Sequence, residues 1–180
     1  MSTPSTIHAE ALAVFQAMPS KHLIDYIVEN FHDKHRAQLP ELINLARKIE
    51  DVHNDHEACP AGLAELLQSM YQELESHMMK EEQILFPMLA GGIYPSGPIA
   101  VMEEEHDQHE QMLAELLELT HQNQAPRGAC GSWIMLYEGL NELVKDLQLH
   151  IDIENSILFK QADKPASSGH GNGHCCGGCQ

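Results

Sequence analysis

The amino-acid sequence predicts an all-α protein, an up-down-up-down four-helix bundle with an internal helical-hairpin pseudo-repeat. Four long segments carry apolar residues at spacings of three and four, and short stretches rich in Gly and Pro separate them. Val, Ile and Thr do not alternate with polar residues over the length of a strand. The second half of the chain also repeats the histidine, glutamate and leucine pattern of the first half.

Each expected helix has a start or a stop signal. Ser20 is expected to cap the first helix, Pro40 to kink it, and Pro60 to occupy the first turn of the second. The glycines and prolines of residues 91–98 and 124–132 separate the later helices. The expected helices are Ser20–Asp51, Pro60–Ala90, Ile99–Gln122 and Trp133–Gln161. We therefore expect an N-terminal extension (1–19), the bundle (20–162) and a flexible tail rich in Gly, His and Cys (163–180).

Composition excludes several classes of function. The chain has 10 Lys and Arg against 27 Asp and Glu, a net charge of −17, which disfavours binding to nucleic acid and to membrane surfaces. No apolar run approaches the roughly 18 residues of a membrane span, and no secretory signal is visible, so we expect a cytoplasmic protein. The 5 Cys do not form a disulfide framework, whereas 13 His beside so many acidic residues point to metal.

The repeated residues include the histidines and glutamates that could bind metal. His32-Asp33-x-His35 recurs as His106-Asp107-x-His109, and His77-x-x-x-Glu81 recurs as His150-x-x-x-Glu154. Two hairpins related by pseudo-symmetry would place equivalent residues face to face across the bundle axis. Counted from the helix ends, the four histidines His32, His77, His106 and His150 lie about 12–18 Å below one end of the bundle, and the two glutamates lie about one turn nearer that end.

On the second and fourth helices the histidine and the glutamate interrupt apolar stripes. The two stripes are Leu63, Leu67, Met70, Leu74, His77, Glu81, Ile84, Met88 and Trp133, Leu136, Leu140, Leu143, Leu147, His150, Glu154, Ile157. A buried carboxylate is costly unless it is paired or binds a metal. Four His and two Glu are too many for one tetrahedral zinc, but they suit two six-coordinate irons bridged by both carboxylates. One oxo or hydroxo bridge then leaves about two positions open for a small molecule.

Other histidines have less definite roles. His35 and His109 lie on the stripes, three residues beyond His32 and His106, either as outer partners of the ligands or as replacements for them. His53 lies about 21 residues, or roughly 30 Å, from His32 along a straight helix, so we expect it away from the metal layer.

The stretches FHDKHRAQLPELI, ESHMMKEEQILFPM, GPIAVMEEEHD and LHIDIENSILF resemble the hemerythrin-like domain, and most closely its iron–sulfur-cluster repair branch, over about residues 20–162. The resemblance implies a four-helix bundle with a non-haem di-iron centre. Its ligands would be His32, His77, His106 and His150, and its bridges Glu81 and Glu154. The family also uses a histidine that His53 matches. Typical members begin with a small domain carrying Cys-Cys-Gly-Gly, whereas this sequence carries Cys175-Cys176-Gly177-Gly178 and Cys179 in its tail.

Three functions are consistent with these features. The first, implied by the resemblance, is repair of iron–sulfur clusters damaged by nitric oxide or oxidants, by a non-enzymatic iron donor with NO chemistry at the open positions. Its partners would be damaged or apo iron–sulfur proteins. The second is a carrier or sensor of O₂ or NO. The third is a ferritin-like ferroxidase or oxygenase, which uses Glu-x-x-His pairs. Glu29-x-x-His32 and Glu103-x-x-His106 have that spacing, but both glutamates are expected to face away from the core. We rank the three in this order.

Overall fold

The computed structural model describes residues 12–161, and in this range the protein is helical with no strand, as the sequence predicts. The predicted extension and tail fall largely or wholly outside the described residues. In the order of the chain, the helices and π-helical turns are α2 (Ser20–Ile27), η1 (Val28–His32), α3 (Asp33–Val52), α4 (Leu63–Lys80), η2 (Glu81–Leu85), α5 (Phe86–Ala90), α6 (Ser96–Leu119), α7 (Gly131–Ile153) and η3 (Glu154–Leu158).

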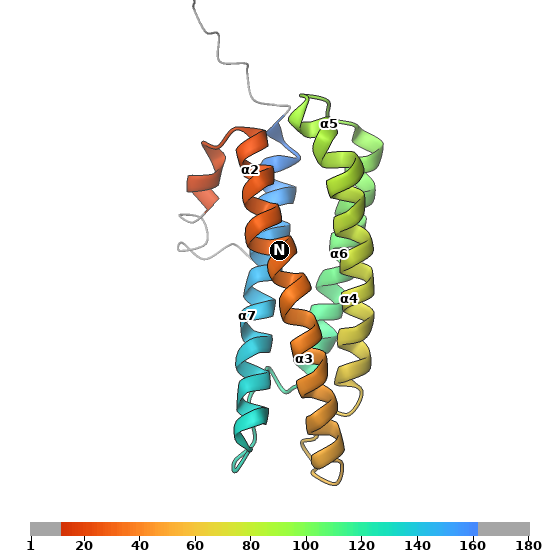
Figure 1. Ribbon diagram of the computed structural model, residues 1–180, viewed down its shortest axis with the longest axis vertical. Coiled ribbons are helices and arrows are strands. Elements are labelled where there is room, and N and C mark those ends of the chain that lie inside the picture. The colour runs from red at the N-terminus through yellow and green to blue at the C-terminus, as the bar shows by residue number, and fades with distance from the viewer. Residues whose placement is uncertain (1–11, 162–180) are drawn as a thin grey trace, which may run out of the picture.

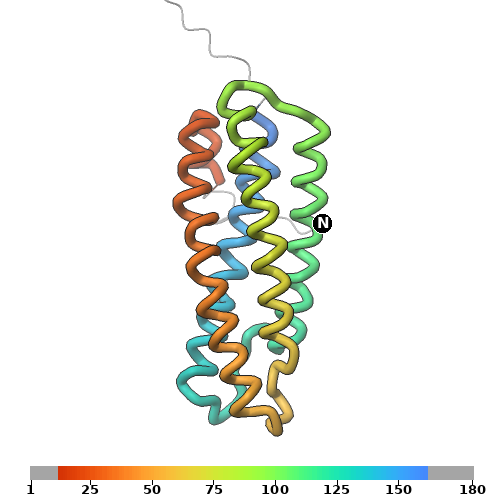
Figure 2. Tube along the Cα trace, turned by 45° about the vertical axis from the view of Figure 1, so that its right-hand side comes forward, coloured from red at the N-terminus to blue at the C-terminus, as the bar shows by residue number. Residues whose placement is uncertain are grey.

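These elements join end to end into four long rods that lie side by side (Figure 1 and Figure 2). The connections alternate between the two ends. We call the end with residues 91–95 the upper end, and the end with residues 53–62 and 120–130 the lower end. α3 packs against α4 and α7, and α6 also packs against α4 and α7. α3 and α6 therefore occupy opposite corners of the bundle.

Several predicted boundaries need correction. Ser20 does not cap the first helix, since Pro19 is the N-cap residue and the Ser20 hydroxyl bonds to Tyr94 and Gln161 instead. Pro40 lies inside the helix as the sequence predicts, and α3 continues on both sides of it. Pro60 precedes α4 rather than forming its first turn, because the chain first makes a turn at Gly62, whose φ of +92° suits glycine.

The main departure from regular helix is a set of three π-helical turns. η1 ends at His32, η2 begins at Glu81 and η3 begins at Glu154. A π turn inserts one extra residue and rotates the following residues around the helix, and such turns often mark functional sites. The predicted stripe is therefore wrong beyond Glu81: Ile84 is 57% exposed, whereas Leu85 is buried.

The hydrophobic core is divided into two clusters. The larger one fills the lower part of the bundle and includes Leu67, Leu113 and Leu140. The smaller one lies toward the upper end and includes Phe31 of η1, Phe86 of α5, and residues of η2, α6 and η3. A layer of buried histidines and glutamates lies between the two clusters. No helix within residues 12–161 combines the length and the apolar character needed to cross a membrane.

Candidate metal centre

The structure brings all six residues that the sequence singled out into one buried layer. Each of these residues is at most 1% exposed. The histidines come from the four different rods, and the glutamates come from the first residues of η2 and η3. The six residues are His32, His77, Glu81, His106, His150 and Glu154.

His32 and His150 form one half of this layer, which we call half-site A. Their Nε2 atoms lie 3.2 Å apart. Glu81 Oε2 lies 3.4 Å from Nε2 of His32, and Glu154 Oε1 lies 3.0 Å from Nε2 of His150. Four donor atoms, two nitrogens and two oxygens, therefore surround one point.

His77 and His106 form half-site B with the same two glutamates. Their Nε2 atoms lie 3.0 Å apart. Glu81 Oε1 lies 3.4 Å from Nε2 of His77, and Glu154 Oε2 lies 3.1 Å from Nε2 of His106. Each glutamate thus offers one oxygen to each half-site, which is the arrangement of a bridging carboxylate.

The donor set fits metal ions better than it fits a network of hydrogen bonds. The four carboxylate oxygens of Glu81 and Glu154 are buried without a hydrogen bond of good geometry. Two nitrogens bound at about 2.1 Å to one metal at right angles would lie roughly 3.0 Å apart, close to the Nε2 separations observed. The layer is therefore a His/Glu cluster capable of binding metal, with two groups of four donors.

Outer hydrogen bonds fix the orientation of His32 and His77. Nδ1 of His32 lies 2.7 Å from Oε1 of Glu82, and this carboxylate also accepts a bond from Arg36. Nδ1 of His77 lies 2.8 Å from Oε2 of Glu105. Metal-binding histidines commonly donate their second ring N–H to a carboxylate, which leaves the Nε2 lone pair for the metal.

The other two histidines differ from each other. Nδ1 of His106 lies 2.7 Å from Oδ1 of Asn155, whereas Nδ1 of His150 is buried without a hydrogen-bond partner. The ring of His150 instead stacks on Phe31, with centroids 5.2 Å apart and planes 2° from parallel. Sequence reasoning missed the outer partners Glu82, Glu105 and Asn155, although each one adjoins a predicted ligand in the chain.

Without metal the layer has paired charges. Burial alone lowers the pKa of His32, but close contacts with Glu154 and Glu81 outweigh burial and raise this pKa to about 10. For His106, burial is likewise outweighed by Glu154, and the pKa rises to about 9. Burial raises the pKa of the Glu154 carboxyl, yet the neighbouring histidines hold it well below its usual range. A cation that binds here therefore displaces protons from imidazoles.

His35 and His109 lie beside the two half-sites but in neither group of four donors. The ring of His35 lies 5.4 Å from that of His150, and the ring of His109 lies 4.9 Å from that of His77. Burial, and then the nearby ligand histidines, lower the pKa of His35 well below 6.5 and that of His109 to about 3. Both imidazoles are therefore neutral.

The remaining residues lie away from the layer. His53 caps α3 at the lower end, where its Nε2 lies 3.3 Å from Sγ of Cys130, so it is distant from the layer as expected. Glu29 is exposed, and Glu103 pairs with Lys160. Neither of these glutamates joins the six residues, and the ferritin-like arrangement is absent from residues 12–161.

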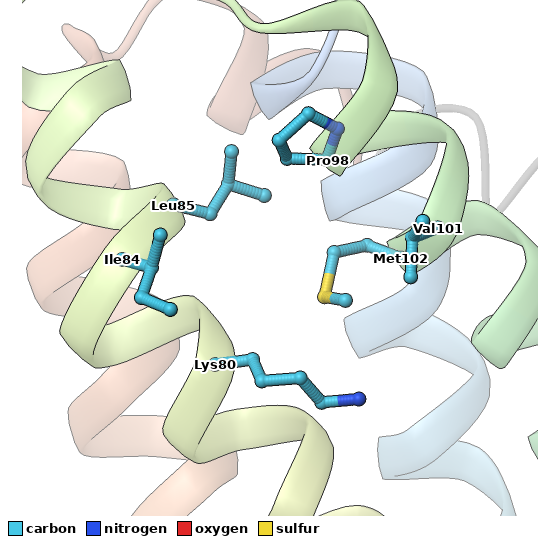
Figure 3. A pocket seen from close by; sticks show the side chains of 6 residues that line it. All are labelled: Lys80, Ile84, Leu85, Pro98, Val101 and Met102. Carbon is cyan, nitrogen blue, oxygen red and sulfur yellow. The ribbon is translucent and has the colours of Figure 1, made fainter.

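An apolar cavity of about 210 Å³ opens on the surface above half-site B, between η2 and α6 (Figure 3). Its lining is apolar except for Lys80, and Met102 and Leu85 close its inner side. The ammonium group of Lys80 pairs with Glu105, which in turn bonds to His77. The cavity has no metal donors and is separate from the six-residue layer.

The sequence matches known proteins over the same region. The family model of the Hemerythrin HHE cation binding domain matches residues 23–162. The Iron-sulfur cluster repair protein YtfE of Pectobacterium carotovorum subsp. carotovorum is 50% identical over 146 residues, which are 80% of this chain and 66% of that protein. The protein of the same name from Yersinia pseudotuberculosis is 49% identical over 150 residues, 82% and 68% of the two chains. The chain thus spans about two thirds of the length of these curated relatives.

Proposed function

The chain belongs to the hemerythrin HHE cation binding domain family, and from this premise we propose that it is a di-iron protein that helps repair damaged iron–sulfur clusters. The damage would arise from nitrosative or oxidative stress, and the repair would use iron donation and NO chemistry at the metal pair. The names of the similar proteins, iron-sulfur cluster repair proteins, support the word repair. The partners would be damaged or apo iron–sulfur proteins, and NO or O₂ would be the small ligands.

One observation carries the di-iron part of the proposal: Glu81 and Glu154 each direct one oxygen to half-site A and the other to half-site B. A single metal ion would leave one oxygen of each carboxylate buried and unpaired, which is costly. Two iron ions would use all four oxygens and all four Nε2 atoms.

The residues of the chain have separate tasks in this function. The four histidines would hold one ion in each half-site, and the two glutamates would contribute one oxygen to each ion. Glu82, Glu105 and Asn155 orient three of the imidazoles. The two apolar clusters on either side exclude water from the layer. Bound iron would supply a redox-active pair with open positions and a store of iron for an apo cluster.

The test is reactivation of an NO-damaged iron–sulfur enzyme by the purified, iron-loaded full chain. We expect the iron-loaded protein to restore activity, and the metal-free protein and the Glu154→Leu variant to restore much less. His53→Ala is the matched control, since it alters a histidine at the lower end and should leave repair intact. Absence of recovery, together with tight reversible binding of O₂, would instead favour an O₂ or NO carrier or sensor.

The proposal also includes the tail (163–180), which lies outside the described residues. Cys176-Gly177-Gly178-Cys179 has a spacing that allows two thiolates to share a metal or to close a disulfide. We expect truncation after Gln161 to leave iron binding and the fold intact but to slow cluster repair or iron transfer. Equal repair rates for the truncated and full chains, both insensitive to thiol reagents, would show that the tail is dispensable.

A further inference from the structure

His35 and His109 are buried polar side chains that nothing else in the described residues explains. His35 is 0% exposed, and neither of its ring nitrogens has a hydrogen-bond partner. His109 is 3% exposed, and its Nδ1 is buried without a partner. A buried donor or acceptor without a partner destabilises the fold, so a well-packed core would normally hold an apolar residue at such positions.

Both histidines lie on the opposite side of the layer from Glu81 and Glu154. The first and third rods run from the upper end downward, so His35 and His109 lie about 4.5 Å lower along the bundle than His32 and His106. The second and fourth rods run upward, which places Glu81 and Glu154 about 6 Å higher than the histidines that precede them by four residues. The carboxylates therefore approach the layer from above and the two spare imidazoles from below.

Helix geometry directs these imidazoles toward the layer. Side chains on a helix lean toward its N-terminus, so those of His35 and His109 lean upward, toward His32 and His106. The ring contacts agree, because His35 lies against His150 of half-site A and His109 lies against His77 of half-site B. Since α3 and α6 occupy opposite corners, the two histidines face the layer from opposite sides of the bundle axis.

We propose that His35 and His109 bind the small external ligand of the metal pair, each donating a ring N–H to an anionic nitrogen or oxygen atom held below the metals. This inference rests on the di-iron site of the proposed function. An imidazole ring N–H donates a hydrogen bond, and an atom that carries negative charge is the stronger acceptor for it. The two histidines are therefore not metal ligands but determine which small ligands the site retains.

The experiment uses the iron-loaded full chain and azide as the probe ligand, with binding followed by visible absorption. His35→Leu and His109→Leu remove the ring nitrogens and place an apolar side chain in apolar surroundings. We expect each variant to keep two irons per chain and to bind azide about tenfold more weakly, the effect of one lost hydrogen bond to a charged group. His35→Gln and His109→Gln keep an N–H donor and should restore most of the affinity. His53→Leu is the control and should bind azide like the unaltered protein.

The melting temperature of the metal-free protein distinguishes a ligand-binding role of these histidines from a packing role. The metal-free His35→Leu protein should melt at the same temperature as the unaltered metal-free protein or higher, because an unpaired polar group has been removed. The proposal is overturned if the leucine variants bind azide normally, if they lose iron, or if their metal-free forms melt much earlier. It is also overturned if the unaltered protein holds two irons but does not bind azide. Failure of the unaltered protein to hold two irons would contradict the di-iron site itself.

Discussion

The two hairpins of the bundle have the same candidate ligands but different supports for them. Offsets of 73 and 74 residues relate the equivalent pairs, which are His32 with His106, His77 with His150, and Glu81 with Glu154. The residue after each glutamate of the layer bonds to a histidine in both hairpins: Glu82 to His32, and Asn155 to His106. The contact of one hairpin thus recurs in the other with an amide in place of a carboxylate.

A second outer carboxylate, that of Glu105, is present in half-site B only. Glu105, which precedes His106, accepts a hydrogen bond from His77. Its counterpart by the same offset is Phe31, which precedes His32 and stacks on His150 instead. Both histidines of half-site B therefore have a polar outer partner, whereas half-site A has one supported histidine and one, His150, without a partner. The comparison teaches that a repeated ligand set does not imply two equal metal sites.

The largest effect is expected from the residues that the two half-sites share. Glu81→Leu or Glu154→Leu removes a bridge and should cost most of one iron per chain, because both half-sites lose an oxygen ligand. Iron analysis of the purified variants measures this. His53→Ala should keep both irons, and full loading of either glutamate variant would break the assignment.

Removal of metal should destabilise both hairpins together. In the metal-free layer the contacts of Glu81 and Glu154 with histidines lack good hydrogen-bond geometry, and each poorly satisfied buried group costs about 1–3 kcal/mol. We expect iron to raise the melting temperature well above that of the metal-free protein. Equal melting temperatures for the two forms, measured by circular dichroism, would mean that the layer does not hold metal.

The difference between the half-sites should appear in iron release. A chelator should remove iron in two phases, a faster one from half-site A and a slower one from half-site B. Asn155→Leu removes the outer partner of His106 and should weaken half-site B by about 10–100-fold, so that the slow phase becomes faster. Asn44→Leu, at an exposed amide of α3, is the matched control. If the unaltered protein releases its iron in a single phase, the outer partners do not make the two half-sites differ in their rate of iron release.

The smallest effect is expected when equivalent isoleucines in the π turns of the two hairpins are replaced by alanine. Ile84 and Ile157 are equivalent in the repeat, but Ile84 is 57% exposed and Ile157 is 3% exposed. Ile157→Ala should therefore lower the free energy of unfolding by about 2–5 kcal/mol, whereas Ile84→Ala should change it by no more than about 0.5 kcal/mol. Urea unfolding of the two variants measures the difference. Similar losses of stability in both would contradict the burial of Ile157 and the exposure of Ile84.

Sequence periodicity and the internal repeat were sufficient to place the four rods and to pick out the six residues that the structure brings together, because His77 and Glu81 share a helix face until the π turn begins. Periodicity failed at Ile84, which is exposed, whereas the equivalent Ile157 is buried although η3 begins at the equivalent residue. It also missed Glu82 and Glu105, which resemble solvent-facing acids in the sequence. Only the packing of neighbouring rods shows that their carboxylates reach buried imidazoles.

The central claim is that two metal ions share Glu81 and Glu154. X-ray absorption of the iron-loaded full chain, with the iron content of the same sample, tests this claim most directly. We predict about two irons per chain, with nitrogen and oxygen neighbours and a second iron at roughly 3–4 Å. One iron per chain, or two irons with no iron neighbour at that distance, would contradict it.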